Sequence, residues 1–265
     1  MTRARIVGIV LVQNDDVFVE RAVRNVADFC DELILVDHRS SDGTPEILAR
    51  LADELPHAEA HSVRDPRNSH DLIAPLVGQA VWVFGVDGDE LYDPRGLPEM
   101  RERILSGEFD RWFGLKGNVL HCDQLDLEAG VACGWLAPPA RSITKLFNFA
   151  ALDSWGGEVP ERLHGGTPVF RDSYHWESTW MLRDRYEWHE SPFRCLHTCF
   201  LPRSSAQPNQ IARLNPPDRL KQGMTSRVAA RLLTLAGRPP KSRWKLSRYR
   251  QGPRVCVDAE GFFPG

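Results

Sequence analysis

The opening stretch of the chain constrains the fold most, because it reads as strand, helix and strand in succession. Residues 6–12 form a continuous apolar run of the kind that fits a central parallel strand. Polar residues at 14–16 can cap a helix over 17–29, whose apolar residues recur at roughly helical spacing. A second apolar run follows at 33–36, and Pro45 suits the first turn of the next helix. The pattern predicts an α/β protein built on a mostly parallel sheet.

A third apolar run, at 80–86, leads directly into Asp87-Gly88-Asp89-Glu90. Ligands of open parallel sheets bind at the carboxyl ends of the strands, so this acidic element, Asp37 and residues 12–15 are expected at one edge. Two carboxylates two residues apart can hold one hard divalent cation, which usually keeps some waters and takes its other ligands from substrate phosphates. An acidic surface turn is the simpler interpretation of these four residues taken alone.

Two further elements are expected between Asp37 and this acidic element, and two more after it. They are a strand at 57–63, a helix at 70–80 that Asn68 or Ser69 can cap, a helix at 97–105 and a strand at 112–120.

Four segments closely resemble family 2 glycosyltransferases of the GT-A fold, in the order and at the separations typical of that family. They are residues 12–16 (VQNDD), 29–37 (FCDELILVD), 40–44 (SSDGT) and 82–90 (WVFGVDGDE). The resemblance is strong over residues 6–95 and thinner beyond them. It implies the GT-A fold, which is a Rossmann-like, mostly parallel central sheet with flanking helices, and it implies a nucleotide-sugar donor.

The resemblance also places the donor site on polar residues at the ends of the first strands. By matching position, the residues that bind the nucleotide-sugar are Gln13, Asn14, Asp37 and Asp87. In the family, the pair matched by Asp87 and Asp89 binds Mn²⁺ or Mg²⁺ on the diphosphate. Arg67 matches the arginine of an Arg-Asn pair that family members often carry, and a guanidinium can bind phosphate through two hydrogen bonds. An ordinary surface arginine is the alternative interpretation of Arg67.

Weaker matches in the second half indicate where the chemistry would take place. Residues 143–147 (ITKLF) and 155–161 (WGGEVPE) resemble the family's RLF … G-x-VHE stretch, with Pro160 in place of the histidine. The resemblance makes Glu161 the catalytic base, with Glu158 as a competing carboxylate. A carboxylate in a partly desolvated pocket can have the raised pKa that suits this role.

Two aromatic residues complete the expected site. His175 resembles the histidine that some GT-A enzymes place beside the metal, and it is a candidate third ligand through a neutral ring nitrogen. Six of the eight tryptophans lie within residues 110–190. Aromatic faces pack on the apolar side of sugar rings, so Trp155 is a candidate acceptor platform, although most large aromatic residues serve as core packing.

Length and composition agree with a single catalytic domain plus an extension. A chain of 265 residues with 42 % hydrophobic content can bury a full α/β core. We expect a catalytic domain at 1–200, with a nucleotide-sugar-binding half at 1–95 and an acceptor half at 96–200, and an extension at 201–265. The sequence has no apolar stretch of the roughly 20 residues that a membrane span requires, and no signal peptide is expected.

The six cysteines form no CxxC pair and are expected as reduced thiols of a cytoplasmic protein. Residues 195–199 (CLHTC) resemble part of a zinc site, but a partner pair of ligands is missing from the sequence pattern. Buried thiols are therefore the preferred interpretation.

The net charge of −3 conceals an asymmetry along the chain. Residues 1–200 hold 20 Lys and Arg against 33 Asp and Glu, whereas residues 201–254 hold 13 against one. Residues 218–235 have the apolar stripe of a helix surrounded by basic residues. Such a helix could pack on the acidic body or lie at a membrane surface near a lipid-linked acceptor. Nucleic-acid binding is disfavoured, because the tail has no recognition motif and the body is acidic.

These features predict a metal-dependent, inverting, hexosyltransferase-like enzyme that transfers a sugar to a hydroxyl of a small-molecule or lipid-linked acceptor. Inversion is implied by the resemblance alone, and retaining transfer stays open. A nucleotidyltransferase would be expected to carry a Gly-rich, basic loop where this chain has residues 13–16 (QNDD). A non-catalytic nucleotide-sugar-binding protein would lose the metal pair or the base, and Pro160 keeps that alternative open. The expected location is the cytoplasm, with peripheral contact at the inner face of the membrane as a further alternative.

Overall fold

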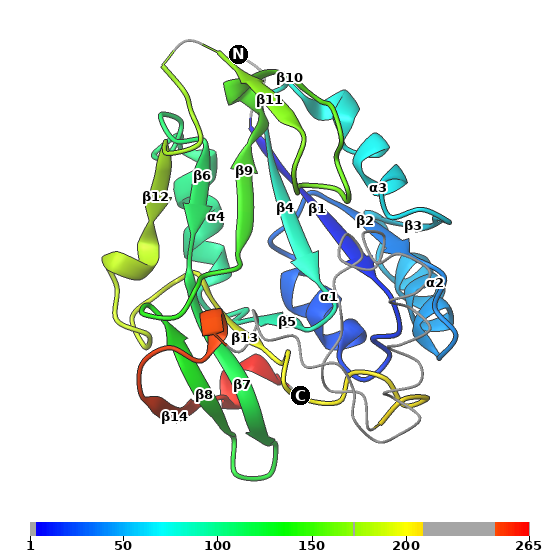
Figure 1. Ribbon diagram of the computed structural model, residues 1–265, viewed down its shortest axis with the longest axis vertical. Helices are drawn as coiled ribbons and strands as arrows, with labels where there is room; N and C mark the ends of the chain where they lie inside the picture. The colour runs from blue at the N-terminus through cyan, green and yellow to red at the C-terminus, as the bar shows by residue number, and fades with distance from the viewer. Residues whose placement is uncertain (1–3, 172, 209–246, 265) are drawn as a thin grey trace.

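A computed structural model describes residues 4–171, 173–208 and 247–264 (Figure 1). Its centre is a seven-stranded sheet with the strand order β12-β6-β9-β4-β1-β2-β3. β9 runs antiparallel to both of its neighbours, and the other neighbouring strands run parallel. The strands are β1 (Arg5–Val12), β2 (Glu32–Asp37), β3 (Ala58–Ser62), β4 (Val81–Asp87), β6 (Gly114–Lys116), β9 (Lys145–Asn148) and β12 (Thr179–Met181). The predicted α/β class with a mostly parallel central sheet is confirmed.

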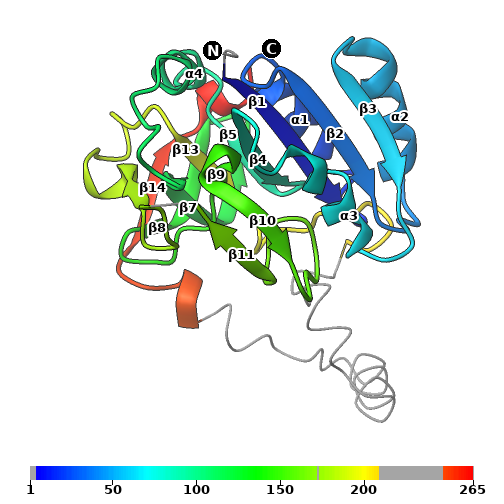
Figure 2. The same ribbon diagram turned by 90° about the horizontal axis from the view of Figure 1, so that it is seen from above.

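Helices cover one face of this sheet, and a short helix with a β-hairpin covers the other (Figure 2). The first group is α1 (Val19–Ala27), α2 (Thr44–Glu54) and α4 (Leu97–Leu105), and the second is α3 (Asn68–Asp71) with β10 (Leu152–Gly156) and β11 (Thr167–Phe170). Ile6 and Val10 of β1 belong to the core cluster on the helical side, whereas Val7 and Ile9 belong to the cluster on the other side. This alternation, with both faces buried, explains why β1 is apolar throughout.

A second, five-stranded sheet has the order β14-β8-β7-β13-β5. Its strands are β5 (Glu90–Tyr92), β7 (Asn118–Asp126), β8 (Val131–Ala137), β13 (Arg194–His197) and β14 (Arg254–Asp258). The single strand expected at 112–120 is therefore wrong, because the chain leaves the first sheet at Lys116 and enters the second at Asn118. Gly117 permits this crossover, since a Cβ there would lie 2.0 Å from the carbonyl oxygen of Phe193.

The helices and the third strand expected in the first half are found, with one correction. The expected elements at 57–63 and 97–105 correspond to β3 and α4. The helix expected at 70–80 is instead the single turn α3 followed by a 3₁₀ turn at Ala74–Leu76. Pro75 lies in that turn, and because proline has no N–H and disfavours helical backbone before it, a continuous helix cannot form. Three other 3₁₀ turns follow strands: Phe149–Ala151 follows β9, Leu182–Asp184 follows β12 and Glu260–Phe262 follows β14.

The end of the chain returns to the second sheet. β14 pairs with β8 so that Cys256 lies opposite Cys133, and the two form a disulfide. The expectation that all six cysteines are reduced is wrong for this pair, because cysteines 123 residues apart leave no spacing signal in the sequence. The helix expected at 218–235 lies outside the described residues, and the domain boundary after residue 200 stays a prediction. Within the described part of the chain, we find no helix of sufficient length and apolar character to cross a membrane.

Candidate active site

A cavity of about 410 Å³ opens at the carboxyl ends of β1 and β4. Its wall includes the ends of both strands, so residues 12–15 and the Asp87–Asp89 element do share one edge, as the parallel sheet requires. The facing wall comes from the second half of the chain. The charged residues that line the cavity are Asp15, Asp87, Asp89, Lys116, Arg141, Lys145, Glu161 and Arg203.

The glycine between the two aspartates is required by close packing of the strand ends. A Cβ at Gly88 would lie 2.7 Å from Cγ1 of Val12 and 2.9 Å from Cβ of Asp15. Any larger residue would push the ends of β1 and β4 apart. The glycine thus brings the Asp87–Asp89 element against the loop that follows β1.

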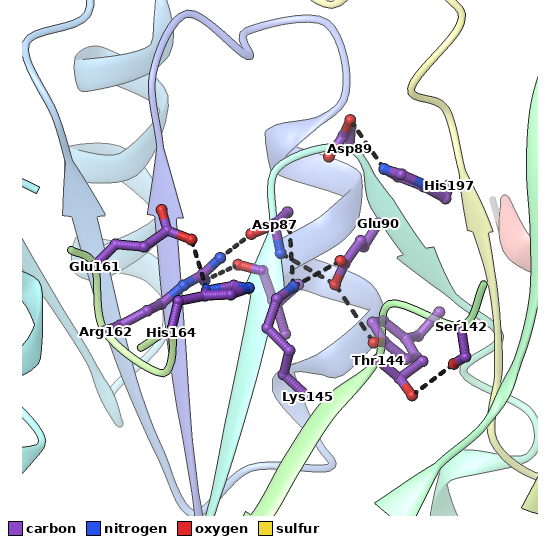
Figure 3. Close-up of polar contacts among 12 residues, drawn as sticks. Asp87, Asp89, Glu90, Ser142, Thr144, Lys145, Glu161, Arg162, His164 and His197 are labelled. Atoms are coloured by element: carbon purple, nitrogen blue, oxygen red, sulfur yellow. Dashed lines mark hydrogen bonds and ion pairs between the residues drawn. The ribbon is translucent and has the colours of Figure 1, made fainter. Parts of the chain in front are cut away.

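Asp87 is held by two cations from distant parts of the chain (Figure 3). Its Oδ2 lies 3.0 Å from Nζ of Lys145, and its Oδ1 forms an ion pair with Nη2 of Arg162. Arg162 is fully buried, and its Nη1 also donates to the carbonyl oxygens of Ile9 and Val86 at 3.0 and 2.5 Å. These bonds fix the Arg162 guanidinium between β1 and β4 and direct Asp87 toward it.

Lys145 also neutralises a carboxylate that is completely buried. Its Nζ lies 2.9 Å from Oε1 of Glu90, which has no exposed surface. Burial lowers the pKa of Lys145, but the charge and hydrogen bond of Glu90 outweigh burial and raise it, so the ammonium group stays charged. Glu90 in turn accepts a hydrogen bond from the backbone N–H of Asp87 at 3.2 Å. Glu90 therefore braces the loop.

We expect Lys145→Met to lower the free energy of unfolding by about 3–5 kcal/mol, because it leaves the buried Glu90 charge unpaired. Urea unfolding followed by tryptophan fluorescence measures the change. The double variant Lys145→Met/Glu90→Gln, which removes both charges, should recover part of the loss. Arg171→Met breaks the exposed pair with Asp153 and should cost less than about 1 kcal/mol. A Lys145→Met variant no less stable than Arg171→Met would contradict this account of the buried pair.

Asp89 lies in a more enclosed position than Asp87. Only 2 % of its surface is exposed, and its Oδ2 forms an ion pair with Nη1 of Arg203 and lies 3.5 Å from Nε2 of His197. Arg203 also lies 3.4 Å from Oδ1 of Asp15. A divalent cation bound by Asp89 would therefore share the carboxylate with Arg203 or displace the Arg203 guanidinium from it.

A second histidine determines how His197 faces Asp89. His121 is fully buried, with Nε2 2.8 Å from the carbonyl oxygen of Arg141 and Nδ1 2.8 Å from Nδ1 of His197. Burial, with a contribution from the charge of His197, lowers the pKa of His121 to about 3, so its ring is neutral. Its proton must lie on Nε2, where the carbonyl accepts it, so Nδ1 accepts a hydrogen bond from His197. A neutral His197 then presents the lone pair of Nε2 toward Asp89.

The arrangement of Asp89 and His197 fits a cation between them. A carboxylate oxygen and an imidazole lone pair 3.5 Å apart are both metal ligands, and Mn²⁺ accepts oxygen and nitrogen donors of this kind. Cys199 offers a different set, because its sulfur and one ring nitrogen each of His121 and His197 lie within 4.8 Å of one another. Both ring nitrogens of His121 are already in hydrogen bonds, so binding of a metal by His121 would remove one of the two contacts that fix its tautomer.

Glu161 lines the same cavity, with 13 % of its side chain exposed. Its Oε1 lies 2.7 Å from Nδ1 of His164, which also lines the cavity. Burial acts to raise the pKa of Glu161, but the hydrogen bond and charge of His164 and the charge of Lys145 outweigh burial and lower it. The raised pKa expected from the sequence is therefore wrong. Glu158 is exposed and outside the cavity wall, so the cavity has Glu161 as its candidate base.

The residues predicted to bind the nucleotide divide into two groups. Gln13 lines the cavity. Asn14 and Asp37 shape the adjoining loops, since Oδ1 of Asn14 accepts from the backbone of Ser41 at 2.6 Å and Asp37 accepts from the backbone of Ser40 at 3.2 Å. Asn14 has a φ of 55°, a left-handed conformation that asparagine tolerates better than most residues. Their roles toward a nucleotide stay predictions.

Three other predicted residues lie outside the cavity wall. Arg67 is exposed and forms an ion pair with Asp65. His175 is 63 % exposed and faces Glu177, so the structure does not bring it to Asp89. Trp155 is buried, and its Nε1 donates to the carbonyl oxygen of Gly165 at 3.0 Å, which is a core arrangement. The cavity-lining tryptophan is instead the neighbouring Trp176, which is 44 % exposed.

Sequence reasoning missed the positive side of the site. Lys145 lies inside the ITKLF segment and Arg162 directly follows Glu161, yet neither had a partner that the sequence could identify. His197 was noticed only as part of the CLHTC segment. His121 and Arg203 carried no signal at all, because their partners lie 76 and 114 residues away.

The fold and the site define an α/β protein with a mixed-charge cavity at the carboxyl ends of its parallel strands. No family model matches the chain, and no curated protein matches it. Among the solved structures that are similar to it are two that were determined with Mn²⁺ and a nucleotide or nucleotide-sugar.

The first similar structure is a mannosyltransferase from Pyrobaculum calidifontis in complex with GDP-Man and Mn²⁺, at 20 % identity and a TM-score of 0.34. The match covers 47 % of this chain and 37 % of that one, so this chain spans little more than a third of that protein's length. The second is glucosyl-3-phosphoglycerate synthase from Mycobacterium tuberculosis with Mn²⁺, UDP and glucosyl-3-phosphoglycerate, at 18 % identity, a TM-score of 0.39, and coverage of 90 % and 82 %. Likenesses this low leave the activity of this chain to be judged from its own site.

Proposed function

We propose that this protein is a metal-dependent glycosyltransferase of the GT-A type, related to family 2, that uses a nucleoside-diphosphate sugar. The observation that carries the proposal is the single cavity at the strand ends where Asp87 and Asp89 face Glu161 and His197. Candidate metal ligands and a candidate base that line one cavity are what transfer from a diphosphate donor to a hydroxyl requires.

Each group has a role that its position supports. Asp89 and His197 would hold Mn²⁺ or Mg²⁺, which when bound supplies a Lewis acid that neutralises the leaving diphosphate. Lys145 and Arg162 hold Asp87 at the wall of the same cavity, where its roles toward the metal and the nucleotide stay predictions. Glu161 accepts the proton of the acceptor hydroxyl as that oxygen attacks the anomeric carbon. Trp176 offers an exposed aromatic face for an acceptor ring.

Attack from the face opposite the leaving group would invert the anomeric centre, and inversion is part of the proposal. The acceptor would be a small molecule or a lipid-linked compound, and no role for nucleic acid is proposed. A cytoplasmic location, with peripheral membrane contact through the basic tail, also stays a proposal.

A metal-independent binding protein on the same fold is the second candidate, and one observation favours it. Asp87 and Asp89 already have cationic partners, which are Lys145, Arg162 and Arg203. Such a protein would bind the diphosphate through these cations without Mn²⁺.

A thermal-shift panel tests both candidates. UDP, dTDP, GDP, CMP and ADP are each added with and without Mn²⁺, and a ligand at a hundredfold excess over its Kd stabilises the native state by about 2.7 kcal/mol. A shift for one nucleoside diphosphate that grows with Mn²⁺ supports the glycosyltransferase. A shift that is independent of Mn²⁺ supports the metal-independent binding protein, and no shift for any nucleotide rejects both.

The histidine pair yields a separate prediction about metal binding. His121→Phe keeps a ring at this position but cannot accept the proton of His197, so the tautomer of His197 is no longer fixed. We expect the affinity for Mn²⁺ to fall by about 10–100-fold with the fold intact, measured by titration calorimetry in the presence of nucleotide. His57→Phe, at a half-buried histidine before β3, is the matched control.

Cys199→Ala distinguishes the two metal arrangements. If Asp89 and His197 hold the ion, this variant should bind Mn²⁺ as the wild type does. If Cys199→Ala binds Mn²⁺ more weakly than the wild type, and the wild type binds Zn²⁺ more tightly than Mn²⁺, the cysteine and the two histidines hold the metal instead.

A further inference from the structure

A second, smaller cavity of about 200 Å³ adjoins the first, and Lys116, Arg141 and Ser142 line both. Arg183 and Arg248 complete its charged lining. Among the described residues, no acidic side chain lines this cavity. It is therefore a positively charged recess that opens from the wall of the proposed active site.

The positive charges of this recess are poorly compensated. Within the described part of the chain, Lys116, Arg141 and Arg248 form no ion pair. Arg183 has an acidic neighbour, with Nε 3.5 Å from the half-exposed carboxylate of Asp184, and its Nη1 lies 3.4 Å from the carbonyl oxygen of Ala140. Burial lowers the pKa of Lys116, and the charges of Arg141 and Arg183 lower it further, which shows that Lys116 lies in a positive field.

The recess is built entirely from residues beyond 95, after the half of the chain expected to bind the nucleotide-sugar. Lys116 ends β6, Arg141 lies between β8 and β9, Arg183 lies in the 3₁₀ turn after β12, and Arg248 precedes β14. None of these residues comes from β1 to β4, whose ends carry the proposed donor and metal residues. The recess and Glu161 nevertheless border the same larger cavity.

We propose that this recess binds an anionic group of the acceptor, a phosphate ester or a carboxylate, while an acceptor hydroxyl lies near Glu161. The inference rests on the proposed function and specifies its acceptor class. Arginine side chains bind phosphate and carboxylate through paired, charge-assisted hydrogen bonds, and a group held at the cavity wall would orient the rest of the acceptor toward the base. A free phosphorylated compound and a phospholipid headgroup would present the same chemistry.

Titration calorimetry with the full-length chain tests the proposal, using glycerol 3-phosphate as the probe and glycerol as the neutral control. We expect glycerol 3-phosphate to bind and glycerol not to bind, and we expect Arg183→Gln and Lys116→Gln each to weaken binding by about tenfold. Arg171→Gln, at an exposed arginine paired with Asp153, should bind as the wild type does. A parallel arm compares sedimentation of wild type and Arg183→Gln with phosphatidylglycerol and phosphatidylcholine vesicles.

The outcomes separate this inference from the proposed function. Arg183-dependent binding of glycerol 3-phosphate supports a soluble anionic acceptor, and Arg183-dependent binding to phosphatidylglycerol vesicles alone supports a lipid-linked one. The inference is overturned if the wild type, Arg183→Gln and Lys116→Gln all bind glycerol 3-phosphate and glycerol equally well. The inference is also overturned if Arg183→Gln loses nucleotide binding while its binding of glycerol 3-phosphate is unchanged, because the recess would then bind the donor. Failure of the wild type to bind any nucleotide removes only the proposed function.

Discussion

Asp89→Asn is expected to abolish the Mn²⁺ dependence of nucleotide binding and to lower kcat/KM by about a thousandfold or more. The substitution keeps the shape of the side chain but removes the charge that would hold the metal. Loss of several kcal/mol of charge stabilisation in the transition state corresponds to this factor. Nucleotide titrations with and without Mn²⁺, followed by sugar-transfer assays with the donor that binds, measure both effects.

Asp89 is buried and paired with Arg203, so the variant must be shown to fold. Thermal unfolding and far-ultraviolet circular dichroism provide that check. Asp153→Asn removes an exposed aspartate that is also paired with an arginine, and it should leave metal dependence unchanged. If Asp89→Asn binds nucleotide with the same Mn²⁺ enhancement as the wild type, the assignment of the metal to Asp89 is wrong.

Glu161→Gln is expected to leave donor binding intact and to reduce kcat by about 10²–10⁴-fold, because general-base catalysis is lost while the side chain keeps its shape. The lowered pKa of Glu161 also sets the pH dependence. A carboxylate with a lowered pKa stays ionised until the pH falls below the ordinary pKa of a glutamate side chain. The wild-type kcat/KM should therefore show no decline from this residue between pH 8 and about pH 5.

His164 provides the competing explanation, because its Nδ1 lies 2.7 Å from Glu161 and it lines the same cavity. If His164 were the base, Glu161 would only orient it, and His164→Gln would then reduce kcat more than Glu161→Gln does. Glu158→Gln is the matched control, since Glu158 is exposed, and its activity should equal that of the wild type. Near-normal turnover in Glu161→Gln would transfer the role of base to His164 or to another group.

Much of the fold follows from local pattern. The apolar run in β1 must be buried on both faces, and Val7 and Val10 do belong to opposite core clusters. The errors arise where a local constraint or a distant contact overrides the pattern. Pro75 ends a helix that its neighbours favour, and the carbonyl of Phe193 directs the chain from one sheet to the other at Gly117. The second of these contacts is invisible in sequence, because its partner is more than seventy residues away.

The sequence by itself determined the α/β class and the edge of the sheet where Gln13, Asp87 and Asp89 meet, because the periodicity of each element and the succession of elements along the chain can be read locally. The tertiary structure alone decided the partners of those groups. Lys145 and Arg162 reach Asp87, and His197 reaches Asp89 with His121 behind it, through strands that pair far along the chain. Side-chain pattern shows which face of an element is buried, but it carries no record of which distant element covers that face. The charges that set the chemistry of this cavity are therefore a property of the folded chain.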